Sequence, residues 1–389
     1  MGRMIIAGGG IAGLATGLAA ARAGLEALIV EQAEGFLEVG AGIQLGPSGR
    51  RALEALGAWE AVSDSIFKPK AIRIRKAATG EDIGVIPLGA AFEKRFGASY
   101  QTIHRSDLLA GLLKTAREKE KITLRTGWRA SVYTFTSEGV LLRARDGREE
   151  AAEALIGADG IRSVVRAQLL LDGPPVFAGH VLYRALMDTA EMPGTVDREN
   201  VNLWLHPGGH VVHYPVSAGR RFNIVASVNE ERTGEGWSMP SRGEILARVF
   251  ANAAAPLRAV LETPGTWLRW IGADRAPVDT WGEGPVSLTG DAAHPTLPYL
   301  ASGAVMALED AATLAGMLEN AGNGDIARPL RAYEQARKGR TARIVRTSHR
   351  LAGVYHARPP VSFLRDQFIR FNSGRRGLER MAWLYDWRS

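Results

Sequence analysis

The residues with the clearest chemical meaning near the start of the chain are the glycines of Gly8-Gly9-Gly10-Ile11-Ala12-Gly13. A short apolar segment precedes them, an alanine-rich helical stretch follows, and Glu31 ends the next apolar segment. In a strand–turn–helix unit this spacing lets a pyrophosphate approach the backbone and rest on the helix N-terminus, while the acid accepts hydrogen bonds from a ribose. Because a carboxylate repels a 2′-phosphate, the pattern predicts an FAD or NAD site at Gly8, Gly10, Ala12, Gly13 and Glu31.

Two further acidic residues lie beside glycines where apolar segments end. Asp159 stands in the run Gly157-Ala158-Asp159-Gly160, and Asp291 follows Gly290. Ligands of α/β sheets bind outside the carboxyl ends of the strands, so both acids are candidate ligand contacts. Gly303 and Ala304 begin a predicted helix that runs to about residue 318, and such a helix start can stabilise an anion.

Gln44 and Arg105 are candidate contacts from other parts of the chain. Gln44 ends a glycine-rich segment, residues 40–44, whose backbone we expect to pass close to something flat or bulky. Arg105 stands just before a predicted helix with Ser106 or Asp107 as its cap, where it can hold a phosphate or a ring carbonyl. A plain glycine loop and a surface ion pair are the alternative interpretations.

Residues from about 181 to 275 alternate between strand-like segments and turns rich in glycine and proline, which predicts an antiparallel sheet. Side chains alternate along a strand, so His210 and Tyr214 should share one face while His213 faces the other way. A histidine and a tyrosine on one face can bind and deprotonate a phenol, although a purely structural histidine fits the sequence equally well. Arg184 is a candidate anion partner, with a structural arginine as the alternative.

Composition restricts the class of protein. The chain has 389 residues, 46% hydrophobic and 23% charged, as in an ordinary globular protein. It has no cysteine, which excludes disulfides and thiolate metal sites, and we predict no metal site. The net charge of +7 comes from scattered arginines without a basic stripe, so we expect no nucleic-acid partner. No apolar run approaches the roughly 20 residues of a membrane span and no export signal is apparent, so we expect a cytoplasmic protein without membrane attachment.

The three glycine-and-acid elements, in this order, resemble those of the single-component (class A) FAD-dependent aromatic hydroxylases, and more closely the salicylate and 3-hydroxybenzoate hydroxylases. The resemblance covers nearly the whole chain. It implies non-covalently bound FAD, with NADH or NADPH as a transient electron donor, because no separate nicotinamide domain is apparent. It also implies a monooxygenase reaction in which reduced flavin and O₂ give a C4a-hydroperoxide that hydroxylates a small phenolic or heteroaromatic acid.

The resemblance further implies roles for single residues. Gln44 and Arg105 match FAD-contacting segments, Asp159 lies near the pyrophosphate and the nicotinamide donor, and Asp291 contacts the ribityl chain. His210 is the candidate base, and Tyr214 helps to position the substrate.

Pro295 and the turn through Ser302, Gly303 and Ala304 are expected at the reacting edge of the flavin. Several relatives have glutamine where this chain has Ser302, so the substrate and the ring position that is hydroxylated stay open. The oligomeric state is also open, with a homodimer among the candidates.

The implied fold is α/β, of the para-hydroxybenzoate hydroxylase type. Residues 1–75, 100–180 and 276–330 form a Rossmann-like FAD-binding domain, and residues 76–99 and 181–275 form an interleaved substrate domain on an antiparallel sheet. Residues 331–389 form a C-terminal helical segment, whose arginines we expect on a solvated or ion-paired face. Two alternatives stay open: an FAD-dependent epoxidase or hydroxylase of a larger heterocycle or antibiotic, and a flavin-binding protein without catalysis.

Overall fold

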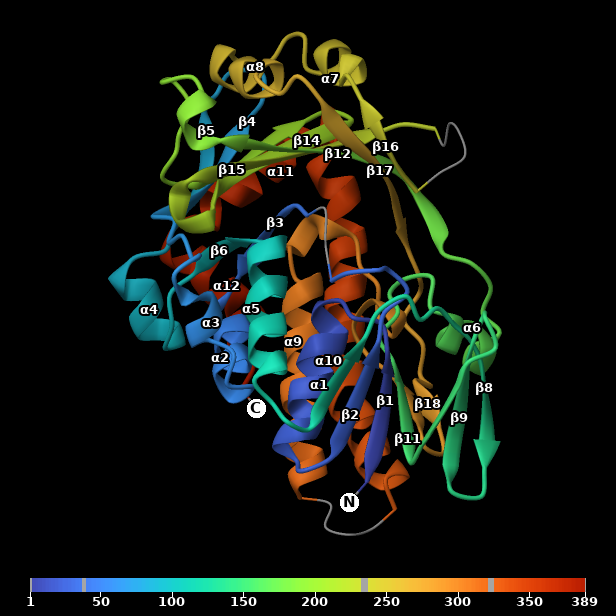
Figure 1. Ribbon diagram of the computed structural model, residues 1–389. Helices are drawn as coiled ribbons and strands as arrows, with labels where there is room; N and C mark the ends of the chain where they lie inside the picture. The colour runs from blue at the N-terminus through green and yellow to red at the C-terminus, as the bar shows by residue number, and fades with distance from the viewer. Residues whose placement is uncertain (1, 37–39, 232–236, 321–324, 389) are drawn as a thin grey trace.

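The computed structural model describes residues 2–36, 40–231, 237–320 and 325–388. An α/β body lies below an eight-stranded sheet, and long helices connect the two (Figure 1). The strands are β1 (Arg3–Ala7), β2 (Glu26–Val30), β3 (Gly42–Leu45), β4 (Ala71–Lys76), β5 (Asp82–Pro87), β6 (Gln101–His104), β7 (Ile122–Arg125), β8 (Ala130–Thr136), β9 (Gly139–Ala144), β10 (Glu149–Ala152), β11 (Ala154–Gly157), β12 (Val176–Asp188), β13 (Val201–His206), β14 (Gly209–Val216), β15 (Arg221–Asn229), β16 (Ser238–Ser241), β17 (Trp267–Asp274), β18 (Gly282–Glu283) and β19 (Val286–Leu288). The helices are α1 (Ile11–Arg22), α2 (Pro47–Ala55), α3 (Glu60–Ser63), α4 (Ala90–Phe96), α5 (Arg105–Arg117), α6 (Val164–Leu170), α7 (Glu244–Val249), α8 (Ala255–Glu262), α9 (Gly303–Glu319), α10 (Ala327–Tyr355), α11 (Val361–Phe371) and α12 (Arg375–Tyr385), with short 3₁₀ turns that include η3 (Gly290–Ala292) and η4 (Pro298–Leu300).

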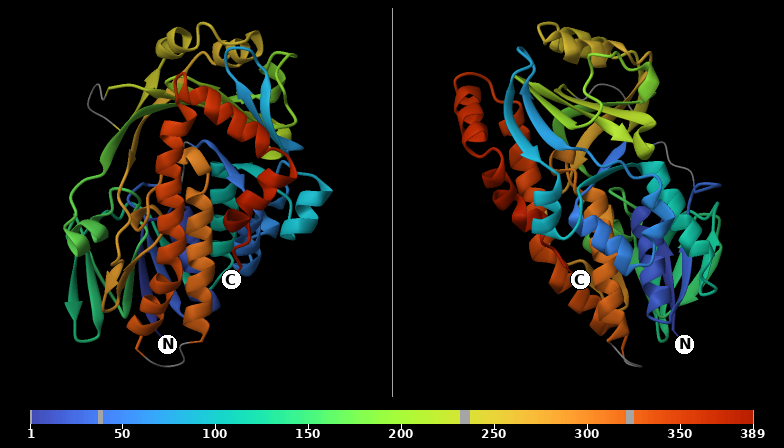
Figure 2. Two further views of the ribbon diagram at one scale, coloured as in Figure 1. Left: turned by 180° about the vertical axis from the view of Figure 1, so that it is seen from behind. Right: turned by 90° about the vertical axis from the view of Figure 1, so that its left-hand side faces the viewer.

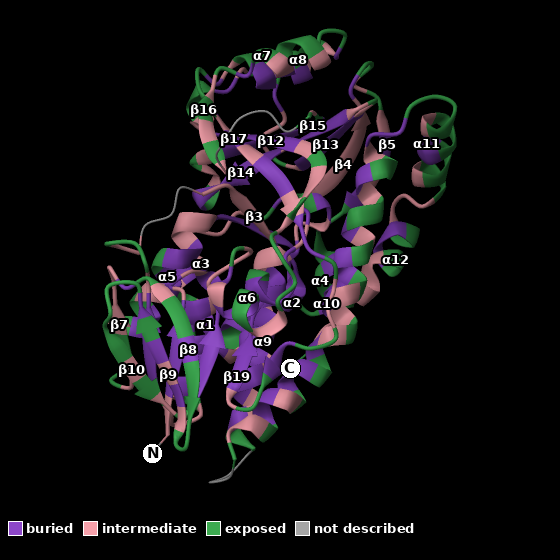
Figure 3. Cartoon of the chain, turned by 90° about the vertical axis from the view of Figure 1, so that its right-hand side faces the viewer, coloured by how far each residue is buried: buried purple, intermediate pink, exposed green. Residues whose placement is uncertain are grey.

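The six-stranded sheet of the lower body has the order β18-β19-β11-β1-β2-β7 and is parallel except for β18. Its central strand β1 is apolar and completely buried from Met4 to Ala7, as a strand with both faces covered must be. Helix α1 packs against β1 and β2 and also contacts α5 and α9, while the small sheet β10-β9-β8 contacts β1 and β11. Figure 3 shows the resulting contrast between buried residues around α1 and α9 and exposed residues on β8 to β10. The predicted Rossmann-like α/β architecture is therefore confirmed.

The upper sheet has the order β16-β17-β12-β15-β14-β13-β4-β5 and is antiparallel apart from the β13–β4 pair. The predicted strand segments 201–205, 211–216 and 222–228 lie within β13, β14 and β15. Strand β4 enters this sheet at Ala71 and β12 at Val176, a few residues before the boundaries predicted at 75 and 180. The division into domains stays a prediction.

Helix α10 runs from the lower body to the upper sheet, beside α9 (Figure 2). Its Arg337 is 1% exposed and donates to Glu309 and Asp310 at 2.8 and 2.7 Å. Burial of a guanidinium lowers its pKa, but these two carboxylates outweigh burial and raise the pKa of Arg337. Of the two alternatives, a solvated or an ion-paired face, Arg337 fits the ion-paired one, and its burial is an addition that the sequence did not predict.

The N-cap of helix α5 lies two residues before Ser106, the first of the two predicted caps. His104 is the N-cap, in extended conformation, and Arg105 is the first helical residue. The prediction of Ser106 or Asp107 as the cap was wrong because β6 pairs with β3 up to His104, which holds the backbone extended until the helix begins. Asp107 instead accepts a hydrogen bond from Ser217 at 2.6 Å.

Candidate active site

A cavity of about 610 Å³ lies between the carboxyl ends of the lower parallel strands and the face of the upper sheet. Residues from the turn after β1 and from α1, β3, α5, β12, β14, η3 and α9 line it. The predicted site residues that border this cavity are Gly8, Gly10, Ala12, Glu31, Gln44, Arg105, Asp159, His210, Tyr214, Asp291, Gly303 and Ala304. The fold therefore brings segments that are up to about 300 residues apart in the sequence to one place.

The glycine turn between β1 and α1 has the geometry that a dinucleotide requires. Gly8 has φ +110°, a conformation that favours glycine, and a Cβ at Gly13 would stand 1.8 Å from the Gly8 carbonyl oxygen. A Cβ at Gly10 would meet nothing within 4 Å, so this position opens toward the cavity. Gly13 thus allows close packing behind the turn, and Gly10 leaves room in front of it.

Polar groups around this turn are placed to contact a bound dinucleotide. Glu31 accepts hydrogen bonds from the backbone N–H of Gly9 at 2.7 Å and of Ala33 at 2.9 Å, at the end of β2. Two buried cavity-wall atoms, Asp159 Oδ1 and Trp128 Nε1, have no hydrogen-bond partner among the described residues. An acceptor and a donor left unpaired in a wall cost free energy unless a bound group pairs them. The residues present therefore fit a dinucleotide cofactor.

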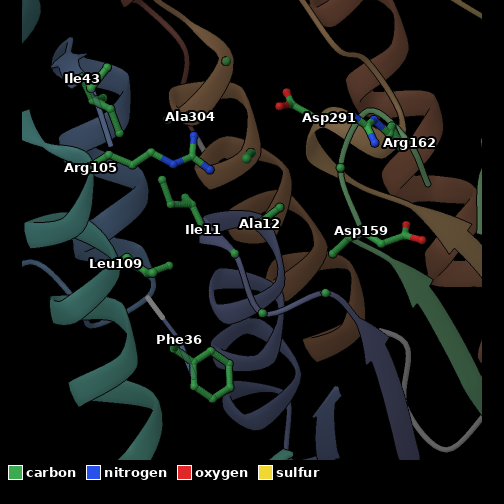
Figure 4. Close-up of a pocket in the computed structure, with 18 of the residues that line it drawn as sticks. Ile11, Ala12, Phe36, Ile43, Arg105, Leu109, Asp159, Arg162, Asp291 and Ala304 are labelled. Carbon is green, nitrogen blue, oxygen red and sulfur yellow. The ribbon is translucent and has the colours of Figure 1, made fainter. Parts of the chain in front are cut away.

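The opposite wall is built from α5, η3 and α9. Arg105 extends from α5 toward Ala304 at the start of α9, as Figure 4 shows. A Cβ at Gly303 would lie 3.9 Å from Asp291 Oδ1, so the turn that carries Asp291 lies next to the beginning of this helix. The helix start supplies backbone N–H groups and positive potential, and Arg105 adds a full positive charge.

Buried ion pairs that sequence reasoning missed hold the Gly290 turn in place. Asp310 accepts hydrogen bonds from the Gly290 backbone, from His294 and from Arg337 at 3.1, 2.5 and 2.7 Å. Arg166, completely buried on α6, donates to the carbonyl oxygens of Ala292 and Ala293. These partners are distant in sequence and follow no local motif, so the sequence carried no signal for them.

His210 and Tyr214 both line the cavity from β14, as the strand-face argument predicted. His213 faces the other side of the sheet, where it accepts a hydrogen bond from Trp204 Nε1 at 2.9 Å and packs against Phe222. Burial, together with the nearby His356 and His180, lowers the pKa of His210 well below its ordinary value, so its imidazole is neutral at pH 7.

Tyr214 keeps its phenolic proton over the working pH range. Burial raises the pKa of this tyrosine, and a hydrogen bond with Gln44 opposes the shift only in part. Gln44 also accepts a hydrogen bond from Tyr100, which packs edge-on against Tyr385. Gln44 is thus held by neighbouring tyrosines at the cavity wall.

Arg184 borders the same cavity, from β12. Its guanidinium lies over the Trp270 ring at 4.8 Å, and its buried Nε has no hydrogen-bond partner among the described residues. Burial and the positive charge of Arg105 lower its pKa to about 10, so it remains a cation at pH 7. A buried, unpaired donor on a half-buried cation is suited to an anionic ligand group.

Two predicted residues do not border the cavity. Gly13 lies behind the glycine turn, and Pro295 is buried outside the lining, where Pro298 and Thr296 take its place. Ser302 does border the cavity, but its hydroxyl donates to the Leu300 carbonyl oxygen at 2.8 Å. The remaining apolar lining includes Val212. Strand alternation places Val212 on the same face as His210 and Tyr214, between them, so the sequence could have predicted this residue in the lining.

A family model described as "FAD binding domain" matches residues 3–348. The chain is 38% identical over 385 residues to 3-hydroxybenzoate 6-hydroxylase of Polaromonas naphthalenivorans (strain CJ2), covering 99% of this chain and 96% of the relative. The chain belongs to the FAD-dependent aromatic hydroxylases. As a member of this family it is a flavoprotein monooxygenase with FAD as its cofactor, which rules out the alternative of a flavin-binding protein without catalysis.

Two solved structures have the same fold. HpxO of Klebsiella pneumoniae, complexed with FAD and uric acid, superposes with a TM-score of 0.86 at 26% identity, over 98% of this chain and 97% of the other. A substrate complex of salicylate hydroxylase superposes with a TM-score of 0.84 at 26% identity, over 100% of this chain and 96% of the other. Among the described residues, no helix has the length and apolar character needed to span a bilayer.

Proposed function

We propose that this hydroxylase adds one hydroxyl group to a small phenolic or heteroaromatic acid, using NAD(P)H and O₂. The observation that carries the proposal is the position of His210 and Tyr214, which face the same cavity as the glycine turn at Gly8–Gly13 and the helix start at Gly303. A relative that is 38% identical acts, by its name, on 3-hydroxybenzoate, so that compound is the first substrate to test.

FAD, when bound, supplies the activation of O₂ and the transfer of one oxygen atom to the ring. The chain's own residues hold it through the glycine turn, Glu31, Asp159 and Asp291, with the positive charge of Arg105 nearby. The turn through Ser302 and Gly303 belongs, in this proposal, at the reacting edge of the ring system. Pro298, which borders the cavity, takes the place predicted for Pro295 as the candidate for shielding that edge from water.

His210 acts in this proposal as the general base for the substrate hydroxyl. Its imidazole is neutral, so it can accept a proton, and its position in the wall brings it within reach of a ring that fills the cavity. A phenolate is a better nucleophile than a phenol, and the imidazolium formed beside it pairs with its negative charge. General base catalysis of this kind contributes about 10² to 10⁴ in rate.

Tyr214 and Arg184 orient the acid. The tyrosine retains its proton and can donate a hydrogen bond, and the arginine offers an unpaired Nε–H and a positive charge to a carboxylate. These groups lie on β14 and β12, so the ring is held from one side of the cavity while the cofactor approaches from the other. The proposal therefore favours an aromatic acid over an uncharged phenol.

The test compares His210→Gln, which keeps a polar side chain but cannot take up the proton, with His213→Gln on the opposite face of the same strand. His213→Gln retains an acceptor for Trp204 and serves as the matched control. Purified enzymes loaded with FAD are supplied with NADH and 3-hydroxybenzoate, and hydroxylated product is measured per NADH consumed. We expect His210→Gln to lose about 10² in product formation while the control retains it. Full, coupled turnover by His210→Gln would refute the role of the base.

If every hydroxybenzoate, aminobenzoate and hydroxypyridine only uncouples NADH oxidation from product formation, the substrate is instead a larger heterocycle. NADH is to be compared with NADPH in the same assay, because the sequence and the cavity favour neither donor.

A further inference from the structure

His210, which lines the cavity, is hydrogen-bonded to a second histidine on the side away from the cavity. Its Nδ1 lies 2.9 Å from Nε2 of His356, and Nδ1 of His356 lies 2.6 Å from Oδ1 of Asn229. His356 is the C-cap residue that follows α10, and its backbone carbonyl accepts a hydrogen bond from the Gly208 N–H in the turn before β14. The end of the long helix α10, visible in Figure 2, thus places the imidazole of His356 next to Nδ1 of His210.

The order of these contacts fixes the direction of the hydrogen bonds. An amide oxygen can only accept, so Nδ1 of His356 must carry the proton that it donates to Asn229. A neutral His356 then has an unprotonated Nε2, which can only accept from Nδ1–H of His210. A neutral His210 with its proton on Nδ1 presents an unprotonated Nε2, which makes no hydrogen bond with the described residues, on the ring that lines the cavity.

The surroundings keep both rings neutral and fixed. Burial, with His180 and His206 nearby, lowers the pKa of His356 to about 4. The ring of His210 is enclosed by Tyr299 at 5.1 Å, Tyr355 at 5.4 Å and His356 at 5.2 Å between centroids. No acidic side chain raises the pKa of either ring against these effects, so both imidazoles stay neutral near pH 7.

We propose that His356 is a positioning residue that holds His210 in the tautomer with an unprotonated Nε2 facing the substrate. This inference rests on the proposed role of His210 as the base. When the substrate hydroxyl gives its proton to Nε2 of His210, the Nδ1–H bond to His356 becomes a charge-assisted bond, which stabilises the imidazolium where no acidic side chain contributes to the pKa of His210. No covalent bond other than O–H is broken, and the proton stays on His210.

The test uses two substitutions at His356 and a control on the same helix. His356→Gln retains an oxygen that can accept from His210 Nδ1, whereas His356→Leu removes any acceptor. His349→Leu, at an exposed residue whose partner is Asp274, measures the effect of a histidine-to-leucine change on α10 itself. Each FAD-loaded enzyme is labelled with ¹⁵N-histidine, and the protonated ring nitrogen of His210 is identified by NMR with His210→Gln as the assignment control.

The measured quantities are the His210 tautomer, the phenolate absorbance of bound 3-hydroxybenzoate and the product formed per NADH. We expect the Nδ1–H tautomer in the wild type, in His356→Gln and in His349→Leu, and a shift toward Nε2–H in His356→Leu. Product formation should fall about 10- to 100-fold in His356→Leu, less than the full general-base contribution, and should be largely retained in His356→Gln.

An Nε2–H tautomer in the wild type would overturn the inference even if His356→Leu does not fold. Equal losses in His356→Gln and His356→Leu would also overturn it, because a structural histidine would be the simpler explanation. If the tautomer is as proposed but His210→Gln retains coupled turnover, the proposed function fails while the positioning of His210 by His356 stands.

Discussion

Substitutions in the glycine turn can separate an effect on FAD binding from an effect on the stability of the fold. Gly10 and Gly13 are three residues apart, yet an added methyl group has opposite surroundings at the two positions. At Gly10 it meets nothing within 4 Å, in backbone conformation that alanine accepts, whereas at Gly13 it would overlap the Gly8 carbonyl oxygen at 1.8 Å. We therefore predict that Gly10→Ala impairs FAD binding alone, and that Gly13→Ala impairs folding as well.

The magnitudes follow from the interactions lost. Displacing a pyrophosphate from the backbone at Gly10 removes one charge-assisted hydrogen bond, about 1.5–3 kcal/mol, which corresponds to an increase in the Kd for FAD of roughly 10- to 150-fold. The free energy of unfolding of the apoprotein should change by less than about 1 kcal/mol, because the weaker helix cap and the reduced entropy of the unfolded chain oppose each other. Overpacking at Gly13 should cost about 1–3 kcal/mol or more of that free energy.

Fluorescence quenching during FAD titration gives the Kd, and urea unfolding of the apoprotein gives the stability. An unchanged Kd in Gly10→Ala would refute the assignment of the cavity's glycine turn to the pyrophosphate. Equal destabilisation of the apoprotein by both substitutions would refute the packing argument.

Three further predictions concern the opposite wall, the substrate and pH. Gly303→Asp should lower FAD occupancy relative to Gly303→Ala, whose methyl has 3.7 Å of clearance, and equal absorbance spectra would contradict this. Arg184→Gln should raise the KM for a hydroxybenzoate by about 10- to 150-fold, the value of one charge-assisted hydrogen bond, but leave the KM of a phenol without a carboxylate nearly unchanged. Burial lowers the pKa of His213 to about 3, so below pH 6.5 the unfolded chain binds a proton that the folded chain does not, and stability is lost as pH falls. At pH 5 this costs about 2 kcal/mol, and urea unfolding at pH 5 and 7 should show a loss smaller by that amount in His213→Gln.

Much of this site could be predicted because its parts are local patterns. The spacing of Gly8, Gly10 and Gly13 describes one turn, and a period of two along a single strand is sufficient to separate His210 and Tyr214 from His213. In both places the physical constraint acts within a few residues, so neighbouring side chains carry the information.

The rest depends on partners that are distant in sequence. His356 reaches His210 only because α10 crosses from one body to the other, and the sequence alone does not give that crossing. Arg337 has the spacing of a solvated helix face but is buried by the carboxylates of α9. At His104, strand pairing with β3 overrode the local preference for serine or aspartate as a helix cap.

The central claim is that one cavity holds FAD against an aromatic acid whose hydroxyl His210 activates. The most direct measurement is mass spectrometry of the products formed from 3-hydroxybenzoate and related aromatic acids by the FAD-loaded enzyme with NADH under ¹⁸O₂. We predict a product that carries one ¹⁸O on the ring, formed in step with NADH oxidation and formed about 10²-fold more slowly by His210→Gln. NADH oxidation that yields only hydrogen peroxide with every aromatic acid, or labelled product at an undiminished rate from His210→Gln, would contradict it.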